Sequence, residues 1–256
     1  MSTPKVAIIL YTVREEAAKD LPGTLKRLRD IGFEYVQWSG MPSMTAEEAR
    51  AALDDAGLKA MGAHCGVEAF EANFEKEVDY WKILGALDVA PGGMMGDCME
   101  DLEAWMRGCR RLDALGARLK EEGMRLSYHN HDHEFTYFPG DDRYKLDILY
   151  EETDPSHLYA ELDVTWVYVG GVDPAAYIRK YAGRCPLLHI KDVAGRRAAD
   201  GSVTFKPVGQ GALDWPEIFA AAREAEAEWL VYEQDLCEGS VFDAAQASFE
   251  FMMTHR

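Results

Sequence analysis

Short apolar runs alternate with amphipathic stretches along most of this chain. The continuous apolar run 5–10 is typical of a strand buried on both faces, whereas the leucines of 21–31 recur at helical spacing until Gly32 ends the pattern. The same alternation then repeats. It predicts strands over 5–10, 35–38, 59–64, 87–90, 124–129, 159–163, 187–191 and 229–233, and helices over 21–31, 45–56, 70–84, 99–122, 146–152, 174–181, 215–225 and 242–254.

Eight strand-then-helix units with no linker between them predict a parallel sheet. At this length they fit one closed (β/α)8 TIM barrel, with residues 1–256 as a single domain. A doubly wound sheet is the alternative. It would place a glycine-rich phosphate turn after an early strand, and Tyr11-Thr-Val-Arg-Glu15 is no such turn.

Composition narrows the class of partner. The 256 residues include 45 acidic and 27 basic side chains, for a formal net charge of -18. This charge argues against nucleic acid and against an anionic membrane surface. The five cysteines are widely spaced, without a CxxC pair, which indicates reduced thiols in the cytoplasm. The first residues have no signal-peptide pattern, and no apolar run reaches the roughly 20 residues of a membrane helix.

Metal-competent side chains end four successive predicted strands. In a TIM barrel these ends meet at one mouth, where the active site lies. Two or three carboxylates with an imidazole suit Mn²⁺, Mg²⁺ or Co²⁺, and Zn²⁺ is a further option. The four stretches are His129 to Glu134 (with His131 and His133), Glu161-Leu-Asp163, His189-Ile-Lys-Asp192 and Glu233-Gln-Asp235.

A set of motifs running from the first strand to the last carries a resemblance. Together they resemble the sugar phosphate isomerase/epimerase superfamily, the xylose-isomerase-like TIM barrels, and within it the branch with inosose dehydratase-like and 3-keto-sugar-processing proteins. The motifs are Tyr11-Thr-Val-Arg14, Tyr128-His-Asn-His131 with Glu134-Phe135, Glu161-Leu-Asp163 with Trp166, Gly171-Val-Asp-Pro174, His189-Ile-Lys-Asp192 and Val208-Gly-Gln-Gly211.

The resemblance implies one divalent ion, with Mn²⁺ preferred. Asp163, His189 and Glu233 match the family's ligand positions directly. Many relatives carry Glu where His129 stands. We therefore expect Glu134 to serve as the remaining ligand, because it restores a hard oxygen donor, with His129 as the alternative.

The implied chemistry is proton abstraction next to a carbonyl through a metal-stabilised enediolate. Glu233 and Glu134 are the candidate bases that flank the sugar, and Lys191 is expected to polarise a carbonyl or hold a negative oxygen. Gln37 stands where many relatives carry Glu, so one acid/base candidate is missing. Expected substrate contacts come from His64, His129, His131, Arg14, Trp166 and Glu161.

Three functions remain open on this basis. The first is a divalent-metal-dependent sugar or polyol isomerase or epimerase. The second is a lyase or dehydratase that uses the same metal site on an inosose or a 3-keto-glycoside. The third is a non-catalytic sugar-binding barrel. The superfamily's endonucleases need several more metal ligands and a basic surface, and the net charge of -18 argues strongly against that function. A homo-oligomer is possible by resemblance.

Overall fold

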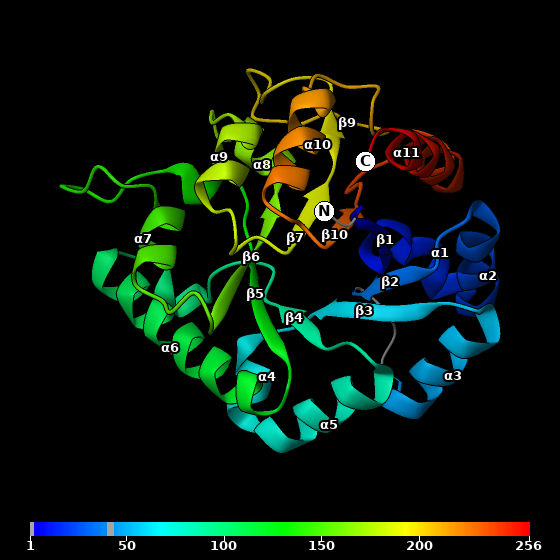
Figure 1. Cartoon of the computed structure of the whole chain (residues 1–256), viewed down its shortest axis with the longest axis horizontal. Coiled ribbons are helices and arrows are strands. Elements are labelled where there is room, and N and C mark those ends of the chain that lie inside the picture. Colours follow the sequence, from blue (N-terminus) through cyan, green and yellow to red (C-terminus); the bar gives the residue numbers. More distant parts are fainter. Residues whose placement is uncertain (1–2, 40–43) are drawn as a thin grey trace.

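Parallel strands form a closed barrel. The computed structural model describes residues 3–39 and 44–256 and is shown in Figure 1. Around the barrel the strands follow the order β1-β10-β7-β6-β5-β4-β3-β2, which confirms the predicted (β/α)8 fold. The barrel strands are β1 (Lys5–Ile9), β2 (Tyr35–Trp38), β3 (Lys59–His64), β4 (Asp88–Ala90), β5 (Arg125–His129), β6 (Leu158–Asp163), β7 (Leu187–Ile190) and β10 (Trp229–Tyr232).

Helices form the outer layer around these strands (Figure 1). The α-helices are α1 (Arg14–Lys19), α2 (Leu21–Ile31), α3 (Ala46–Ala56), α4 (Val67–Ala72), α5 (Phe74–Leu84), α6 (Leu102–Glu121), α7 (Lys145–Glu151), α8 (Val164–Val169), α9 (Pro174–Lys180), α10 (Trp215–Glu224) and α11 (Val241–His255). The 3-10 helices are η1 (Leu10–Val13), η2 (Gly96–Cys98) and η3 (His133–Phe135).

The structure differs from the predicted elements in three places. The helix predicted over 70–84 is two helices, α4 and α5, because Asn73 leaves the helical conformation and its side chain caps α5 through the Lys76 amide. Two short helices were not predicted: α1, which follows η1, and α8, which follows β6 directly. The long loop after β7 contains an antiparallel pair, β8 (Asp192–Val193) and β9 (Phe205–Lys206).

Strand register brings the polar strand ends to one level of the barrel. His129 of β5 pairs with Glu161 of β6, and Asp163 of β6 pairs with His189 of β7. Val231 of β10 also pairs with His189. Glu233 comes two residues after Val231, just past the end of β10. Parallel pairing therefore gathers residues that lie about 100 positions apart in the sequence.

The rest of the chain contributes a packed core. Apolar side chains of the strands and of the inner helix faces are buried together. All five cysteines are free thiols. Within 3–39 and 44–256, none of the helices combines the length and the apolar character needed to cross a membrane.

Candidate metal centre

The two carboxylate oxygens of Asp163 have different roles: one caps a helix and the other faces the barrel mouth. Oδ1 accepts hydrogen bonds from the amides of Thr165 (2.9 Å) and Trp166 (3.0 Å), which caps α8. Oδ2 is buried and has no hydrogen bond of good geometry to any residue that the structure describes, although Lys191 Nζ lies 3.1 Å away. Asn130 fixes the same backbone, since its Oδ1 accepts from the Asp163 amide at 3.0 Å.

His189 is fully buried between acceptors on both sides of its ring. Nδ1 lies 2.7 Å from Glu233 Oε2, while Nε2 lies 2.8 Å from Gln37 Oε1 and 2.9 Å from Glu161 Oε1. Burial opposes a charge on this ring. The carboxylates of Glu161 and Glu233 outweigh it and raise the pKa of His189 to about 10. Without a metal ion, His189 is therefore an imidazolium at neutral pH.

Lys191 is the fully buried cation of the mouth. Its Nζ lies 3.1 Å from Asp163 Oδ2, 3.0 Å from Glu233 Oε2 and 2.9 Å from Asp235 Oδ1. Burial opposes its charge, but the three carboxylates raise its pKa above the ordinary value. Burial also raises the pKa of Asp235 to about 6, which Lys191 partly offsets.

Glu134 lies apart from this group. Its Oε1 accepts from the Tyr128 hydroxyl at 2.7 Å, and its Oε2 accepts from the His131 amide at 2.8 Å. His133 Nε2 lies 3.2 Å from Oε1. In the structure Glu134 therefore lies with His131 and His133 rather than beside Asp163, His189 and Glu233, because η3 directs its carboxylate toward Tyr128.

His129 takes the place that was expected for Glu134. Its Nε2 lies 3.7 Å from Asp163 Oδ2, and its Nδ1 is buried without a hydrogen bond of good geometry within the described ranges. Burial, followed by the charge of His189, holds the pKa of His129 well below its usual value. His129 is thus a neutral imidazole with a lone pair available for a ligand.

These residues fit a divalent cation. His129, Asp163, His189 and Glu233 each offer one ligand atom, and the four atoms lie within 4.8 Å of one another. All four side chains are buried, and Asp163 Oδ2, which has the Lys191 ammonium at 3.1 Å but no well-directed hydrogen bond from the described residues, can accept a further cation or donor. Two carboxylates with two imidazoles suit Mn²⁺, Co²⁺ or Zn²⁺, while an oxygen-rich ion such as Mg²⁺ would need water or substrate oxygens as well.

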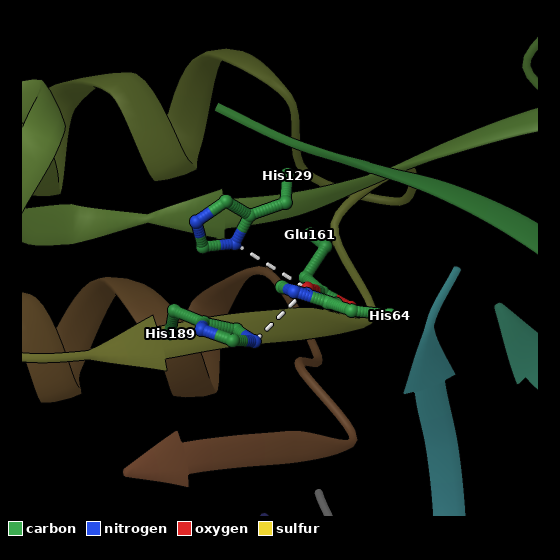
Figure 2. Close-up of side chains that lie close together, drawn as sticks. All are labelled: His64, His129, Glu161 and His189. Atoms are coloured by element: carbon green, nitrogen blue, oxygen red, sulfur yellow. Dashed lines mark hydrogen bonds and ion pairs between the residues drawn. The ribbon is translucent and has the colours of Figure 1, made fainter. Parts of the chain in front are cut away.

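A second set of side chains shares two of these histidines. Figure 2 shows His64, His129 and His189 around the carboxylate of Glu161, and their four ligand atoms also lie within 4.8 Å of one another. The third such set is His131, His133 and Glu134, farther out beside η3. Glu161 is fully buried, and although burial opposes its charge, His64 and His189 hold its pKa well below its ordinary value.

The other expected substrate residues surround the mouth. His64 is half-buried and lines a cavity of about 1190 Å³ together with Trp38 and Trp81. The Trp166 ring is mostly buried, lies 5.6 Å from the His131 ring, and has an indole N–H without a partner among the described residues. Arg14 donates to the Tyr11 and Asp235 carbonyls and lines a separate cavity of about 380 Å³.

Sequence reasoning missed three residues of this centre. Gln37 was noted only as a departure, yet it contacts both His189 and Glu161. Asp235 and Asn130 were not proposed as site residues. The signal for Asp235 was its position two residues after Glu233, because alternate residues of a strand share a face. Nothing in the sequence indicated that Asn130 bonds the backbone of β6.

Comparison with known proteins places the chain in a family. It matches the model of the Xylose isomerase-like TIM barrel family over residues 25–254. The chain therefore belongs to the Xylose isomerase-like TIM barrel family.

Its relatives are named as enzymes. The chain is 25% identical over 165 residues to an inosose dehydratase of Lacticaseibacillus casei, and 29% identical over 129 residues to one of Clostridium perfringens. These alignments cover 59% and 46% of this chain, and 54% and 42% of the two relatives. The chain thus spans about half the length of the curated relatives that it matches.

Solved structures share the fold over nearly the whole chain. A sugar phosphate isomerase/epimerase from Parabacteroides distasonis superimposes with a TM-score of 0.84 at 22% identity, covering 98% of this chain and 94% of that one. A xylose isomerase-like TIM barrel protein from Mycobacterium smegmatis, in complex with magnesium, gives a TM-score of 0.73 at 18% identity, with 99% and 96% covered. At these identities the likeness shows the fold alone.

Proposed function

We propose that this protein is a divalent-metal-dependent enzyme that moves a proton next to a carbonyl group of a sugar or polyol, as an isomerase or epimerase. The observation that carries the proposal is the convergence of His129, Asp163, His189 and Glu233 from four strands, with one buried Asp163 oxygen left without a hydrogen bond by the described residues. In this family fold the mouth of the barrel is where chemistry takes place.

The four residues would hold the ion through two imidazoles and two carboxylates. The bound ion, Mn²⁺ in our first expectation, would polarise a carbonyl and an adjacent hydroxyl and so acidify the C–H bond between them. Binding requires neutral histidines. His129 is already neutral, and His189 must release its proton when the ion binds.

Glu233 is the residue proposed to accept the proton. Burial opposes its charge, but Lys191 and His189 keep its pKa well below the ordinary value, so it is a carboxylate at neutral pH. Its Oε2 faces His189 and Lys191, and a carboxylate has a second oxygen for a proton. Glu134 is not proposed as a base, because its carboxylate is bonded to Tyr128 and the His131 amide.

Lys191 would stabilise the negative oxygen that develops when the proton leaves carbon. Its ammonium group is buried, held by three carboxylates, and therefore oriented before a substrate arrives. The free indole N–H of Trp166 and the half-buried His64 are the side chains proposed to contact sugar hydroxyls. The homo-oligomer stays a prediction.

A dehydratase is the second candidate, and the curated relatives favour it because they are named inosose dehydratases. Removal of a proton next to a carbonyl is the first step of both reactions. Only the dehydratase then expels a neighbouring hydroxyl group as water. Mass spectrometry distinguishes the products, because an isomerase leaves the mass unchanged and a dehydratase lowers it by one water.

The test incubates the protein and Mn²⁺ in D₂O with a panel of keto-sugars and inososes, and NMR monitors the incorporation of solvent deuterium into each compound. The wild type is expected to exchange the proton next to the carbonyl of its substrate. Glu233→Gln should lose this exchange while it still binds the sugar, and Glu238→Gln, a matched change at an exposed side chain, should retain it. Sugar binding without exchange in the wild type would instead identify a non-catalytic sugar-binding barrel.

A further inference from the structure

Glu161 is a fully buried carboxylate whose neighbours are almost all imidazoles. Its Oε1 is hydrogen-bonded to His64 Nε2 and lies 2.9 Å from His189 Nε2 and 3.4 Å from His129 Nδ1 (Figure 2). Its Oε2 accepts from Gln37 Nε2 at 2.7 Å. Such a group has no role in the proposed reaction so far, although burying a charge is costly.

The contacts of His189 determine which of its nitrogens carries the proton. Gln37 donates its amide N–H to Glu161, so its Oε1 faces His189 Nε2, and the Glu161 oxygen faces the same nitrogen. Both neighbours of Nε2 are acceptors, so this nitrogen keeps its proton. Nδ1 also faces an acceptor, Glu233 Oε2, so both nitrogens of the metal-free ring donate; the proton released when the ion binds is the one on Nδ1, which leaves the lone pair directed at Glu233 and the ion.

His129 has the mirror arrangement. Its Nδ1 faces Glu161 and its Nε2 faces Asp163. A proton on Nδ1 satisfies the contact with the carboxylate and leaves the lone pair on Nε2. Glu161 thus lies behind both histidines, on the side opposite to Asp163 and Glu233.

We propose that Glu161 is a positioning residue that fixes the tautomers of both metal-binding histidines, so that their lone pairs face the ion. This inference rests on the proposed metal centre. It replaces a substrate contact as the role of Glu161, in accord with its complete burial. Carboxylates behind histidine ligands orient the ring and raise its basicity, and their loss typically lowers metal affinity about 10–100-fold.

The alternative is that Glu161 itself binds the ion, with His64, His129 and His189. The two ligand sets would then use opposite nitrogens of the two shared rings. A neutral imidazole has only one lone pair, so His129 and His189 cannot serve both sets at once. The proton positions therefore distinguish the two arrangements.

The test combines NMR and calorimetry on the full chain, with Zn²⁺ as a diamagnetic probe. Long-range ¹H–¹⁵N spectra of the ¹⁵N-labelled protein report the protonated nitrogen of each histidine, and His129→Asn and His189→Asn assign the signals. The variant is Glu161→Gln. Its matched control is Asp235→Asn, which also removes one negative charge near the centre but whose carboxylate contacts Lys191.

The expected wild-type result is metal on His189 Nδ1 and His129 Nε2, with protons on the opposite nitrogens. Glu161→Gln should lower Zn²⁺ affinity about 10–100-fold and lose the single tautomer of metal-free His129, while Asp235→Asn keeps it. Equal affinity losses and unchanged tautomers in both variants would overturn the inference but leave the metal centre intact. Zn²⁺ binding that survives Asp163→Asn and Glu233→Gln but not Glu161→Gln would overturn both the positioning role of Glu161 and the proposed metal centre. Absence of Zn²⁺ binding in the wild type would overturn the metal centre on which the inference rests.

Discussion

The two ends of the barrel treat buried charge in different ways. At the N-terminal ends of the strands, Asp88 accepts from Ser127 Oγ and from Arg125 Nε, both at 2.8 Å. Arg125 also makes two hydrogen bonds with Glu228, so each charge has a partner. At the mouth, three carboxylates share Lys191, and Asp163 Oδ2 has no well-directed hydrogen bond from the residues described.

The difference separates a structural network from a functional one. Ion pairs and hydrogen bonds limit the cost of burying Asp88 and Arg125, whereas an excess of one charge is destabilising until a counterion arrives. The mouth keeps such an excess, and with it a site preorganised for a cation. We infer that the fold is stabilised elsewhere to offset this cost.

Lys191 contacts all three mouth carboxylates, so its loss should give the largest effect on stability. In chelator, Lys191→Met is expected to lower the free energy of unfolding by about 3–5 kcal/mol, because it leaves buried carboxylates unpaired. Mn²⁺ should restore more stability to this variant than to the wild type. Urea unfolding followed by circular dichroism measures both.

A surface lysine provides the matched comparison. Lys180 Nζ lies 2.7 Å from Asp147 but is about half exposed, so Lys180→Met should cost at most about 1 kcal/mol. If Lys191→Met proved as stable as Lys180→Met in chelator, the charge excess at the mouth would not be a burden on the fold.

The opposite end should control the pH dependence of stability. Burial raises the pKa of Asp88 to about 7 despite the opposing effect of Arg125. Its folded pKa exceeds its unfolded one, so the protonated form favours folding, and this stability is lost as the pH rises from about 4 to about 7. The wild type should lose about 2–4 kcal/mol relative to Asp88→Asn over that range, with no further change above it. Parallel urea curves for both proteins would contradict this.

A smaller effect is expected at a satisfied carboxylate near the mouth. Asp192 Oδ2 accepts from the amides of Gly209 and Gly211 and from Trp215 Nε1, at 2.8–2.9 Å. A Cβ on Gly211 would lie 2.1 Å from Asp192 Oδ1. Gly211→Ala should therefore cost about 1–3 kcal/mol. Gly195→Ala, whose Cβ would meet nothing within 4 Å, should change stability by less than about 0.5 kcal/mol in the same thermal unfolding assay.

The sequence predicted the strands and the residues at their ends better than the residues in the segments that follow them. Hydrophobic periodicity predicted every barrel strand, and strand ends predicted that Asp163, His189 and Glu233 converge, because topology alone brings them together. Glu134 could not be placed in this way. It follows the end of β5, where alternation no longer applies, and the turn of η3 with the Tyr128 hydroxyl sets its direction. Asn73 likewise broke a helix through a cap that periodicity does not reveal.

The most direct test of the metal centre is a calorimetric titration of Mn²⁺ into chelator-treated protein. We predict one Mn²⁺ site in the wild type. Its affinity for Mn²⁺ should be about 100-fold or more lower in Asp163→Asn, because that variant loses a charged ligand. Glu134→Gln should remain within about tenfold of the wild type, because its carboxylate faces Tyr128 and the His131 amide. Unchanged affinity in Asp163→Asn, together with loss of binding in Glu134→Gln, would contradict the centre described here.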